Sequence, residues 1–408
     1  MENVMGSIPL YEQTIPWKAN YDERRVPAVE IPDPLRMADG SVITTADEWM
    51  EKRRPELIHA FQNIMYGNPL PPATSFTSRV LSEKQLGNYG KRQEIEMTFT
   101  GPTGRTLQTI MLLYTPLTDQ KVPVFVGLTF HGNHAVETDP AIIPTGRKEV
   151  ARGFVARRYP VETILKRGYA IAAAAYHDFY LDKPGPDGWE NSVYPLYYDS
   201  VVPRPPHASA INAWAWGISR MLDVLTESCP QIDSGKAIVY GHSRLGKTSL
   251  WTGVIDERFK LTCVNNSGCG GAALDRRLFG ETLFSMMGCC NDYTFWFSDQ
   301  LQPYARTPEK LPFDQHELIA CIAPRSVAVH SAILDTWSDP KGEYISTYHA
   351  GKVFRLFGLS VPEDPEQPIV GTPVGGELSY YIRNGGHDIL EEDFLHYMDR
   401  ADRIFKMY

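Results

Sequence analysis

The chain has 408 residues, of which 43% are hydrophobic and 22% are charged, as in ordinary globular proteins with a large core. Its net charge of −9 argues against a nucleic acid or an anionic membrane as partner, since either would need a dominant basic surface. The length would allow more than one domain, although α/β folds often reach this size as a single unit.

No membrane or metal signal stands out in the sequence. The longest apolar stretches, such as 168–176, fall far short of the roughly 20 residues that span a bilayer. The first residues have neither the basic nor the apolar region of a secretory signal. The six cysteines lack metal-site spacing, and all could be buried and reduced. They are Cys229, Cys263, Cys269, Cys289, Cys290 and Cys321.

The N-terminal part is predicted as an arm followed by a helix and a hairpin. Residues 1–40 are rich in proline and polar groups and predict an extended arm packed on a core. The stretch from Thr45 to Gly67 predicts a helix, with Thr45 and Glu48 in capping-box register and the glycine as its stop. Residues 75–116 predict strands, including a hairpin around a Gly-Pro-Thr-Gly turn.

Beyond residue 116, short apolar strands alternate with helical segments, among them a periodic run at 207–227. This alternation predicts a mostly parallel sheet covered by helices on both faces. We expect residues 41–408 to form a single domain of this kind. The predicted strands lie at 122–130, 169–176, 236–241, 261–268, 326–332 and 377–383.

Ser243 is the candidate nucleophile. It lies between a predicted strand and a predicted helix, in the sequence Gly-His-Ser-Arg-Leu-Gly-Lys. A sharp turn in this context lifts a serine hydroxyl clear of the sheet and directs a helix N-terminus at the reacting oxygen. An arginine follows the serine, however, and the second glycine arrives one position later than in the usual elbow. The alternative is a serine that merely caps the helix.

A serine nucleophile needs a base and an orienting acid, which follow it in the chain order serine, acid, histidine. His387 lies just beyond a predicted strand, on a Gly-Gly turn, and is the candidate base. Asp335 is the first carboxylate after the preceding apolar run and is the preferred acid, with Asp339 in reserve. Asp388 is expected to cap the final helix.

Three other histidines fit the base less well. His242 is adjacent to the serine, where its side chain would point elsewhere, and we expect it to be structural. His131 and His134 follow an earlier strand, where wall-lining roles are expected.

The motif at 241–247 resembles the G-x-S-R-x-G-K signature of the glucuronoyl esterases, carbohydrate esterase family 15. Further segments resemble bacterial members in order and spacing, so that the similarity covers nearly the whole chain from about residue 20. These segments are 20–35, 127–135, 265–282, 311–326, 335–344 and 383–388.

The resemblance implies an α/β-hydrolase fold, a three-layer sandwich, and a carboxylic ester hydrolase of the 4-O-methyl-glucuronoyl methylesterase type. Such an enzyme cleaves the ester between 4-O-methyl-glucuronic acid on xylan and lignin alcohols through an acyl-enzyme, without cofactor or metal. It would make Ser243 the nucleophile, His387 the base and Arg244 an oxyanion donor. Uronate contacts would come from Lys247, Glu281 and Trp337. A secreted or periplasmic monomer is expected.

Two positions depart from relatives. Fungal members carry a disulfide-bonded cysteine before the serine, where this chain has His242. Many members carry a glutamate acid where this chain has Asn266, which shifts the role of acid to Asp335.

The sequence leaves two other functions open. One is a different carbohydrate-active hydrolase of the same fold, such as a xylan acetyl esterase. The other is an inactive, carbohydrate-binding hydrolase fold. Arg244 could also be a surface ion-pair residue, and the three sugar-binding candidates could be surface or core residues.

Overall fold

The computed structural model describes residues 18–147, 149–288 and 293–406 and contains a ten-stranded sheet in the order β1-β2-β3-β5-β4-β6-β7-β8-β10-β9. The strands are β1 Ser75–Leu86, β2 Gly90–Thr100, β3 Thr106–Pro116, β4 Val122–Thr129, β5 Ala170–Ala175, β6 Ile232–His242, β7 Phe259–Asn265, β8 Ser326–Ala332, β9 Val374–Gly375 and β10 Leu378–Arg383. The α-helices are α2 Ala46–Glu48, α3 Arg54–Phe61, α4 Val161–Lys166, α5 Pro186–Glu190, α6 Ala210–Ser228, α7 Arg244–Ile255, α8 Gln315–Ala320, α9 Pro340–Leu356 and α10 Glu391–Phe405.

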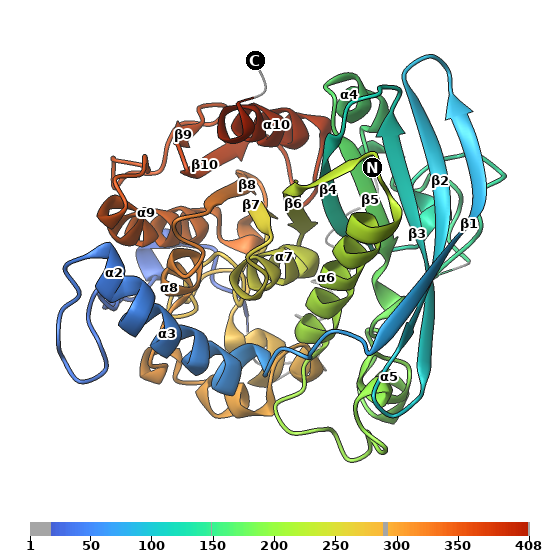
Figure 1. The fold of residues 1–408 in the computed structure, drawn as a ribbon. Coiled ribbons are helices and arrows are strands. Elements are labelled where there is room, and N and C mark those ends of the chain that lie inside the picture. The colour runs from blue at the N-terminus through green and yellow to red at the C-terminus, as the bar shows by residue number, and fades with distance from the viewer. Residues whose placement is uncertain (1–17, 148, 289–292, 407–408) are drawn as a thin grey trace.

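The centre of the sheet is parallel and its edges are antiparallel. Strands β5, β4, β6, β7, β8 and β10 pair in parallel, whereas β1, β2, β3 and β9 pair antiparallel at the two ends. Figure 1 shows β1 to β3 at one edge and β10 with β9 at the other. The parallel strands are the six that the apolar runs predict, and the predicted hairpin is β2 with β3.

Helices cover both faces of this sheet, which confirms the three-layer α/β-hydrolase expectation. Helices α6, α7 and α9 pack on one face, and α4 and α10 pack on the other. The strand residues alternate between two buried clusters: Val124 and Val126 belong to the first, and Phe125 belongs to the second. Because both sides are buried, these strands are continuously apolar instead of alternating.

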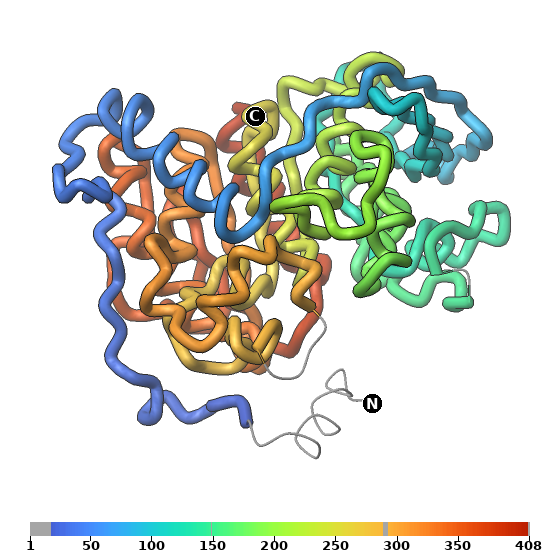
Figure 2. Tube along the Cα trace, turned by 90° about the horizontal axis from the view of Figure 1, so that it is seen from below, coloured from blue at the N-terminus to red at the C-terminus, as the bar shows by residue number. Residues whose placement is uncertain are grey.

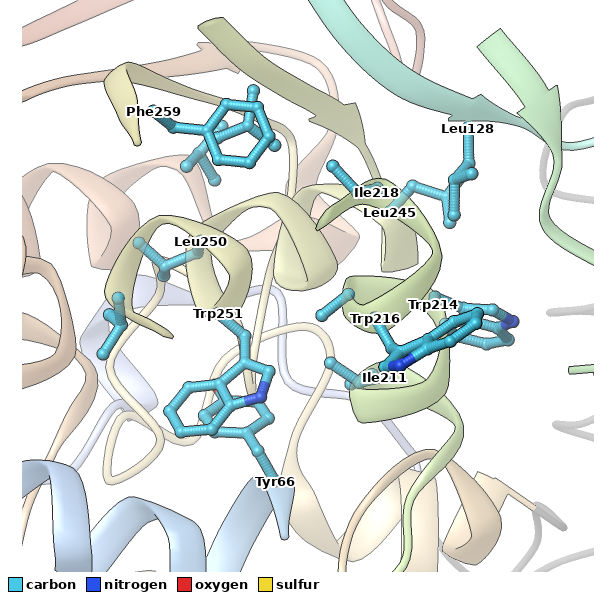
Figure 3. Packing of buried hydrophobic residues seen from close by; sticks show 14 of the residues in the cluster. Tyr66, Leu128, Ile211, Trp214, Trp216, Ile218, Leu245, Leu250, Trp251 and Phe259 are labelled. Atoms are coloured by element: carbon cyan, nitrogen blue, oxygen red, sulfur yellow. The ribbon is translucent and has the colours of Figure 1, made fainter. Parts of the chain in front are cut away.

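Helix α7, which follows the candidate nucleophile, is anchored by a large aromatic contact. Trp251 of α7 stacks on Tyr66 with ring centroids 4.7 Å apart, and both side chains are fully buried. The indole N–H also donates to Asn212 of α6 at 3.2 Å. Figure 3 shows the tryptophan and tyrosine rings lying against one another beneath α7. Together these contacts fix the position of the helix under the site.

The predicted first helix forms from Ala46 to Tyr66, with π-helical turns on either side of α3. Thr45 caps it by accepting from the backbone N–H of Glu48 at 3.2 Å, and Glu48 accepts from Thr44 instead of from Thr45. Gly67 ends it at φ 86°, a conformation that favours glycine.

The segment before this helix runs extended along the side of the domain, as Figure 2 shows for the dark-blue chain from residue 18. It is tied to the core by polar contacts: Gly280 N–H donates to Asn20 O at 2.9 Å, and His316 lies 2.9 Å from Pro32 O. Residues 1–17, in which a signal sequence would be sought, lie outside the described part.

The described cysteines, Cys229, Cys263, Cys269 and Cys321, are buried and free. Cys289 and Cys290 lie outside the described residues. None of the helices in the described part is long and apolar enough to cross a bilayer.

Ser243 forms a sharp turn between β6 and α7, with φ 58° and ψ −130°. The turn brings Gly241 so close to the following helix that a Cβ there would lie 1.9 Å from Leu245 O. A Cβ on Gly246 would lie 3.0 Å from Asn265 O, because α7 passes tightly over the end of β7. Both glycines of the motif are therefore needed for close approach, including the second one, which stands later than in the usual elbow.

We predict that Gly241→Ala destabilises the protein by about 1–3 kcal/mol, the usual cost of overpacking, because the new methyl group meets rigid backbone. Urea unfolding would measure this. Gly235→Ala is the matched control on the same strand, since its nearest atom would be 3.3 Å away and the position is exposed. Equal stability of the two variants would contradict the close-approach explanation.

Candidate active site

Three loops at the carboxyl ends of parallel strands bring together the candidate nucleophile, acid and base. Ser243 follows β6, Asp335 follows β8 and His387 follows β10. In parallel α/β sheets the crevice at this edge is the usual place for a ligand site. Residues that are 144 positions apart in the chain thus lie at the same edge of one sheet.

His387 is held by a buried carboxylate. Its Nδ1 lies 2.6 Å from Oδ2 of Asp335, whose side chain is 2% exposed. Asn266 donates to the same oxygen at 2.6 Å. Burial opposes ionisation of Asp335, but hydrogen bonds from His387 and Asn266 outweigh it and lower its pKa. The acid is therefore ionised, and its contact with the imidazole uses Nδ1 and not Nε2.

His242 supports this pair from one side. It is buried, its Nδ1 lies 2.6 Å from Asn265 Oδ1, and its ring centroid is 4.5 Å from that of His387. Burial, with the neighbouring His387, lowers its pKa well below the ordinary value. A neutral His242 packs against the catalytic candidate without adding charge, in keeping with the structural role expected for it.

The reserve acid has a different position. Asp339 pairs with Arg277 at 2.8 Å and caps α9 by accepting from Gly342 N–H at 3.0 Å. It stands in the left-handed region at φ 50°. Between the two aspartates, it is Asp335 that reaches the imidazole.

The expected helix-capping role of Asp388 is wrong. Its carboxylate binds Arg157 and Arg158, at 2.7 and 2.5 Å. Helix α10 begins after Leu390, whose N–H is bound by Asp393 at 2.9 Å. The ionic partners come from the segment before α4, which no local pattern near residue 388 could reveal.

Arg244, the first residue of α7, is clamped beside the serine. Its Nη1 lies 2.5 Å from Asp182, and its guanidinium lies over Trp296, 4.5 Å from the ring centroid. Trp296 itself donates to Asp182 at 2.8 Å, and Tyr176 does so at 2.6 Å. Nε of Arg244 is buried and has no hydrogen-bond partner within residues 18–147, 149–288 and 293–406. The guanidinium thus has a fixed place and an unused donor.

The predicted sugar-binding residues are brought together, but their exposure differs. Lys247 is 2% exposed, and its ammonium donates to Ser267 O, Cys269 O and Glu281 Oε2 at 2.6, 2.6 and 2.7 Å. All three of its donors are used inside the protein. Glu281 is about one-tenth exposed, and Trp337 is half-buried with its carbonyl accepting from Glu281 N–H at 2.7 Å. Lys247 therefore orients Glu281, and its expected contact with the uronate stays a prediction.

His131 and His134 have unlike surroundings. His134 is buried, with Nε2 3.0 Å from Val150 O, and belongs to the packing of the loop after β4. His131 is half-buried and lies edge-on to the exposed Phe154, with centroids 5.2 Å apart. Burial, followed by nearby arginines, lowers the pKa of His131 to about 4.

Sequence reasoning missed Asp182 and Trp296, which set the position of Arg244. Asp182 lies in an irregular loop after β5 and Trp296 in a short helical turn, and neither belongs to a periodic pattern. Glu343 was missed as well. It is fully buried on α9 and accepts from Ser267 N–H at 2.7 Å and Gly268 N–H at 3.1 Å. It thereby fixes the loop at 267–269, whose carbonyl groups bind Lys247.

The site combines three features: a serine on a strained strand–helix turn, a histidine held by a buried aspartate, and a cation beside the serine. Together they define a serine hydrolase of the α/β-hydrolase class. No group of side chains suited to a metal ion occurs in the described ranges.

Comparisons with known proteins give the family. A family model described as glucuronyl esterase, fungi, matches residues 161–358. A carbohydrate esterase from an unknown prokaryotic organism is 38% identical over 403 residues, covering 94% of this chain and 91% of the relative. The solved glucuronoyl esterase from Solibacter usitatus has a TM-score of 0.85 at 32% identity, covering 94% of this chain and all of that one. A promiscuous esterase of carbohydrate esterase family 15 from a marine bacterial metagenome has a TM-score of 0.84 at 35% identity, covering 94% and 99%.

The chain therefore belongs to the glucuronoyl esterases, carbohydrate esterase family 15, and is a carboxylic ester hydrolase. The resemblance seen in the sequence motifs is confirmed.

The buried Glu343 gives a prediction about pH. Burial raises its pKa to about 7, against the hydrogen bonds from Ser331 and from the backbone of Gly268 and Ser267. In the unfolded chain a glutamate ionises near its ordinary value of about 4.3. Between these values the folded protein keeps a proton that the unfolded chain has lost, so this residue's contribution to the unfolding free energy falls as the pH rises.

Glu343→Gln removes this contribution. We predict that the unfolding free energy of the parent minus that of the variant decreases between about pH 4.5 and about pH 7 and is constant above that range. Urea unfolding at several pH values measures both. The same difference at every pH would contradict the assignment of a raised pKa to Glu343.

Proposed function

We propose that this protein hydrolyses esters of 4-O-methyl-glucuronic acid, such as those that link glucuronoxylan to lignin alcohols, through an acyl-enzyme on Ser243. The observation that carries the proposal is the 2.6 Å contact between His387 and the buried Asp335, beside a serine that stands on the elbow with Arg244 next to it. A relative from Schizophyllum commune that is 26% identical over 82% of this chain is named 4-O-methyl-glucuronoyl methylesterase.

In the proposed mechanism, His387 Nε2 takes the proton of Ser243 as Oγ attacks the ester carbonyl. Asp335 stabilises the resulting imidazolium and keeps the ring in one tautomer. The histidine then protonates the leaving alkoxide, so the alcohol departs neutral and the uronoyl group remains on the serine. A water molecule, activated by the same histidine, hydrolyses this ester and restores the serine.

Arg244 is the proposed donor to the oxyanion. Its Nη1 is occupied by Asp182, whereas Nε is buried without a partner in the described part of the chain. An N–H aimed at the developing negative charge is worth more in the transition state than in the ground state. Because Asp182 and Trp296 already hold the guanidinium, little reorganisation is needed when that charge appears.

The uronate ring is proposed to bind between Glu281 and Trp337. The carboxylate of Glu281 can accept from sugar hydroxyls, and the half-buried indole can offer its N–H or its face. Lys247 forms an ion pair with Glu281 and is itself held by two carbonyl groups of the loop beneath. The lysine thereby fixes the position of Glu281. In this proposal the lysine acts through Glu281 and is a positioning residue.

Since the proposed substrate is a cell-wall polymer, we propose a secreted or periplasmic enzyme. It would act as a monomer with a single catalytic domain over residues 41–408 and would need no cofactor.

The substrate test compares initial rates on benzyl glucuronate and on a simple acetyl ester. The parent should prefer the glucuronate, and Ser243→Ala should be inactive on both while folding normally. Trp337→Ala should raise KM for benzyl glucuronate while barely changing hydrolysis of the acetyl ester, because the small ester does not use the sugar site. Preference of the parent for the acetyl ester would favour an acetyl esterase. Absence of turnover together with no labelling by a serine-directed phosphonate would mean an inactive fold.

The acid is tested by Asp335→Asn, which we predict to lower kcat by about 10⁴-fold, as loss of the orienting carboxylate does in serine hydrolases. In that background, Asn266→Glu should restore part of the rate. The side chain of Asn266 already lies 2.6 Å from Asp335 Oδ2, the oxygen that contacts His387. A near-parent kcat in Asp335→Asn would remove Asp335 from the mechanism, and Asp339→Asn serves as the matched control.

A further inference from the structure

Arg383, the last residue of β10, lies beneath the loop that carries His387. Its side chain is 1% exposed and points into this loop instead of toward solvent. Nη1 donates to Asn384 O at 2.9 Å, and Nη2 donates to Gly386 O at 3.0 Å and to Asp388 O. One guanidinium therefore binds three carbonyl groups within the six residues from 383 to 388.

The guanidinium is itself fixed from below. Its Nε donates to Oδ2 of Asp393 at 3.1 Å, and Asp393 on α10 is fully buried. The same carboxylate accepts from Leu390 N–H at 2.9 Å, and its other oxygen lies 3.1 Å from His330 Nδ1 on β8. Burial outweighs the bond to Asp393 and lowers the pKa of His330, so this ring is a neutral donor. Among the described residues, Asp393 is the carboxylate that pairs with Arg383, and it is anchored in both α10 and β8.

The first glycine of the loop leaves room for this arrangement. Gly385 has φ 102°, and a Cβ on it would lie 2.9 Å from Nη1 of Arg383. The acid's loop is fastened to the same segment, because Leu334 N–H donates to Gly385 O and Ile333 N–H donates to Arg383 O, both at 3.0 Å. A shift of this loop would therefore disturb both the base and its acid.

We propose that Arg383 is a positioning residue for His387, and that Asp393 holds Arg383 for this purpose. The inference rests on the proposed role of His387. A buried guanidinium that donates to several carbonyl groups of one short loop restricts where that loop can place its histidine. Displacement of a catalytic group by about 1 Å typically costs about 10²-fold in rate, so a residue that touches no substrate can control kcat.

The test is Arg383→Lys, which keeps the charge but offers a single ammonium in place of the planar fork. Arg53→Lys is the matched control, because Arg53 is also buried, pairs with the buried Glu317 at 2.6 Å and donates to a carbonyl, that of Pro34. We expect kcat on benzyl glucuronate to fall about 100-fold in Arg383→Lys with KM within twofold, and to stay at the parent value in Arg53→Lys.

A second readout separates positioning from general damage. The nitrophenyl ester of the same acid releases an anion that needs no proton, so its hydrolysis should fall less than that of the benzyl ester. The low-field proton resonance of the His387–Asp335 hydrogen bond should be weakened in Arg383→Lys and retained in Arg53→Lys. A kcat within threefold of the parent, or equal losses on both esters with an unchanged resonance, would overturn the inference.

If Arg383→Lys does not fold, Gly385→Ala replaces it, since the added methyl would displace Nη1. Gly40→Ala is its control, because Gly40 has φ 90° and nothing within 4 Å of a Cβ. The rate at which a phosphonate labels Ser243 reports the activation of the serine whatever the substrate. A parent that is labelled but does not hydrolyse benzyl glucuronate would contradict the proposed substrate. In that case, slower labelling of Gly385→Ala than of Gly40→Ala would still support the role of Arg383.

Discussion

The backbone of Ser243 stands at φ 58° and ψ −130° between β6 and α7, and the other functional groups are arranged around that turn. A residue held in such a sparsely populated backbone conformation lowers the folding stability by about 1–3 kcal/mol, and it persists only where the surrounding structure overdetermines it. Here Ser243 N–H donates to Asn265 O at 2.9 Å, the glycines at 241 and 246 allow α7 to pass close to β6 and β7, and Trp251 anchors the helix on Tyr66. The large buried core thus holds Ser243 in a position that an isolated peptide would not keep.

Ionisable groups of the site lie in close pairs. Asp335 faces His387, Asp182 faces Arg244 and Glu281 faces Lys247, at distances of 2.5 to 2.7 Å. Removal of one partner from a buried pair leaves an uncompensated charge, which is far more costly than the pair itself. This explains why a positive residue follows the serine without disturbing the fold: the guanidinium is held by Asp182 and stacked on Trp296, and it retains an unused Nε–H for the proposed oxyanion.

The loops that carry these groups are fastened from beneath by buried polar residues. Glu343 binds the loop that receives Lys247, and Arg383 with Asp393 binds the loop of His387. Such contacts let irregular backbone lie close to the sheet without unpaired polar groups. They also explain how a site assembled from loops can be rigid enough for catalysis, where small displacements are costly.

The sequence by itself determined much of this protein. Continuous apolar runs predicted the parallel strands, because strands buried on both faces need no polar side, and chain order together with the family motifs placed Ser243, Asp335 and His387. The tertiary structure decided the rest. In it, Asp335 contacts His387 and Asp339 pairs with Arg277. Asp388 binds Arg157 and Arg158 instead of capping a helix, and the ammonium of Lys247 is buried. Asp182, Trp296, Glu343 and Arg383 gained their parts in the same way, for a physical reason: hydrogen bonds and ion pairs depend on distances between segments far apart in the chain, and those distances exist only once the sheet has formed.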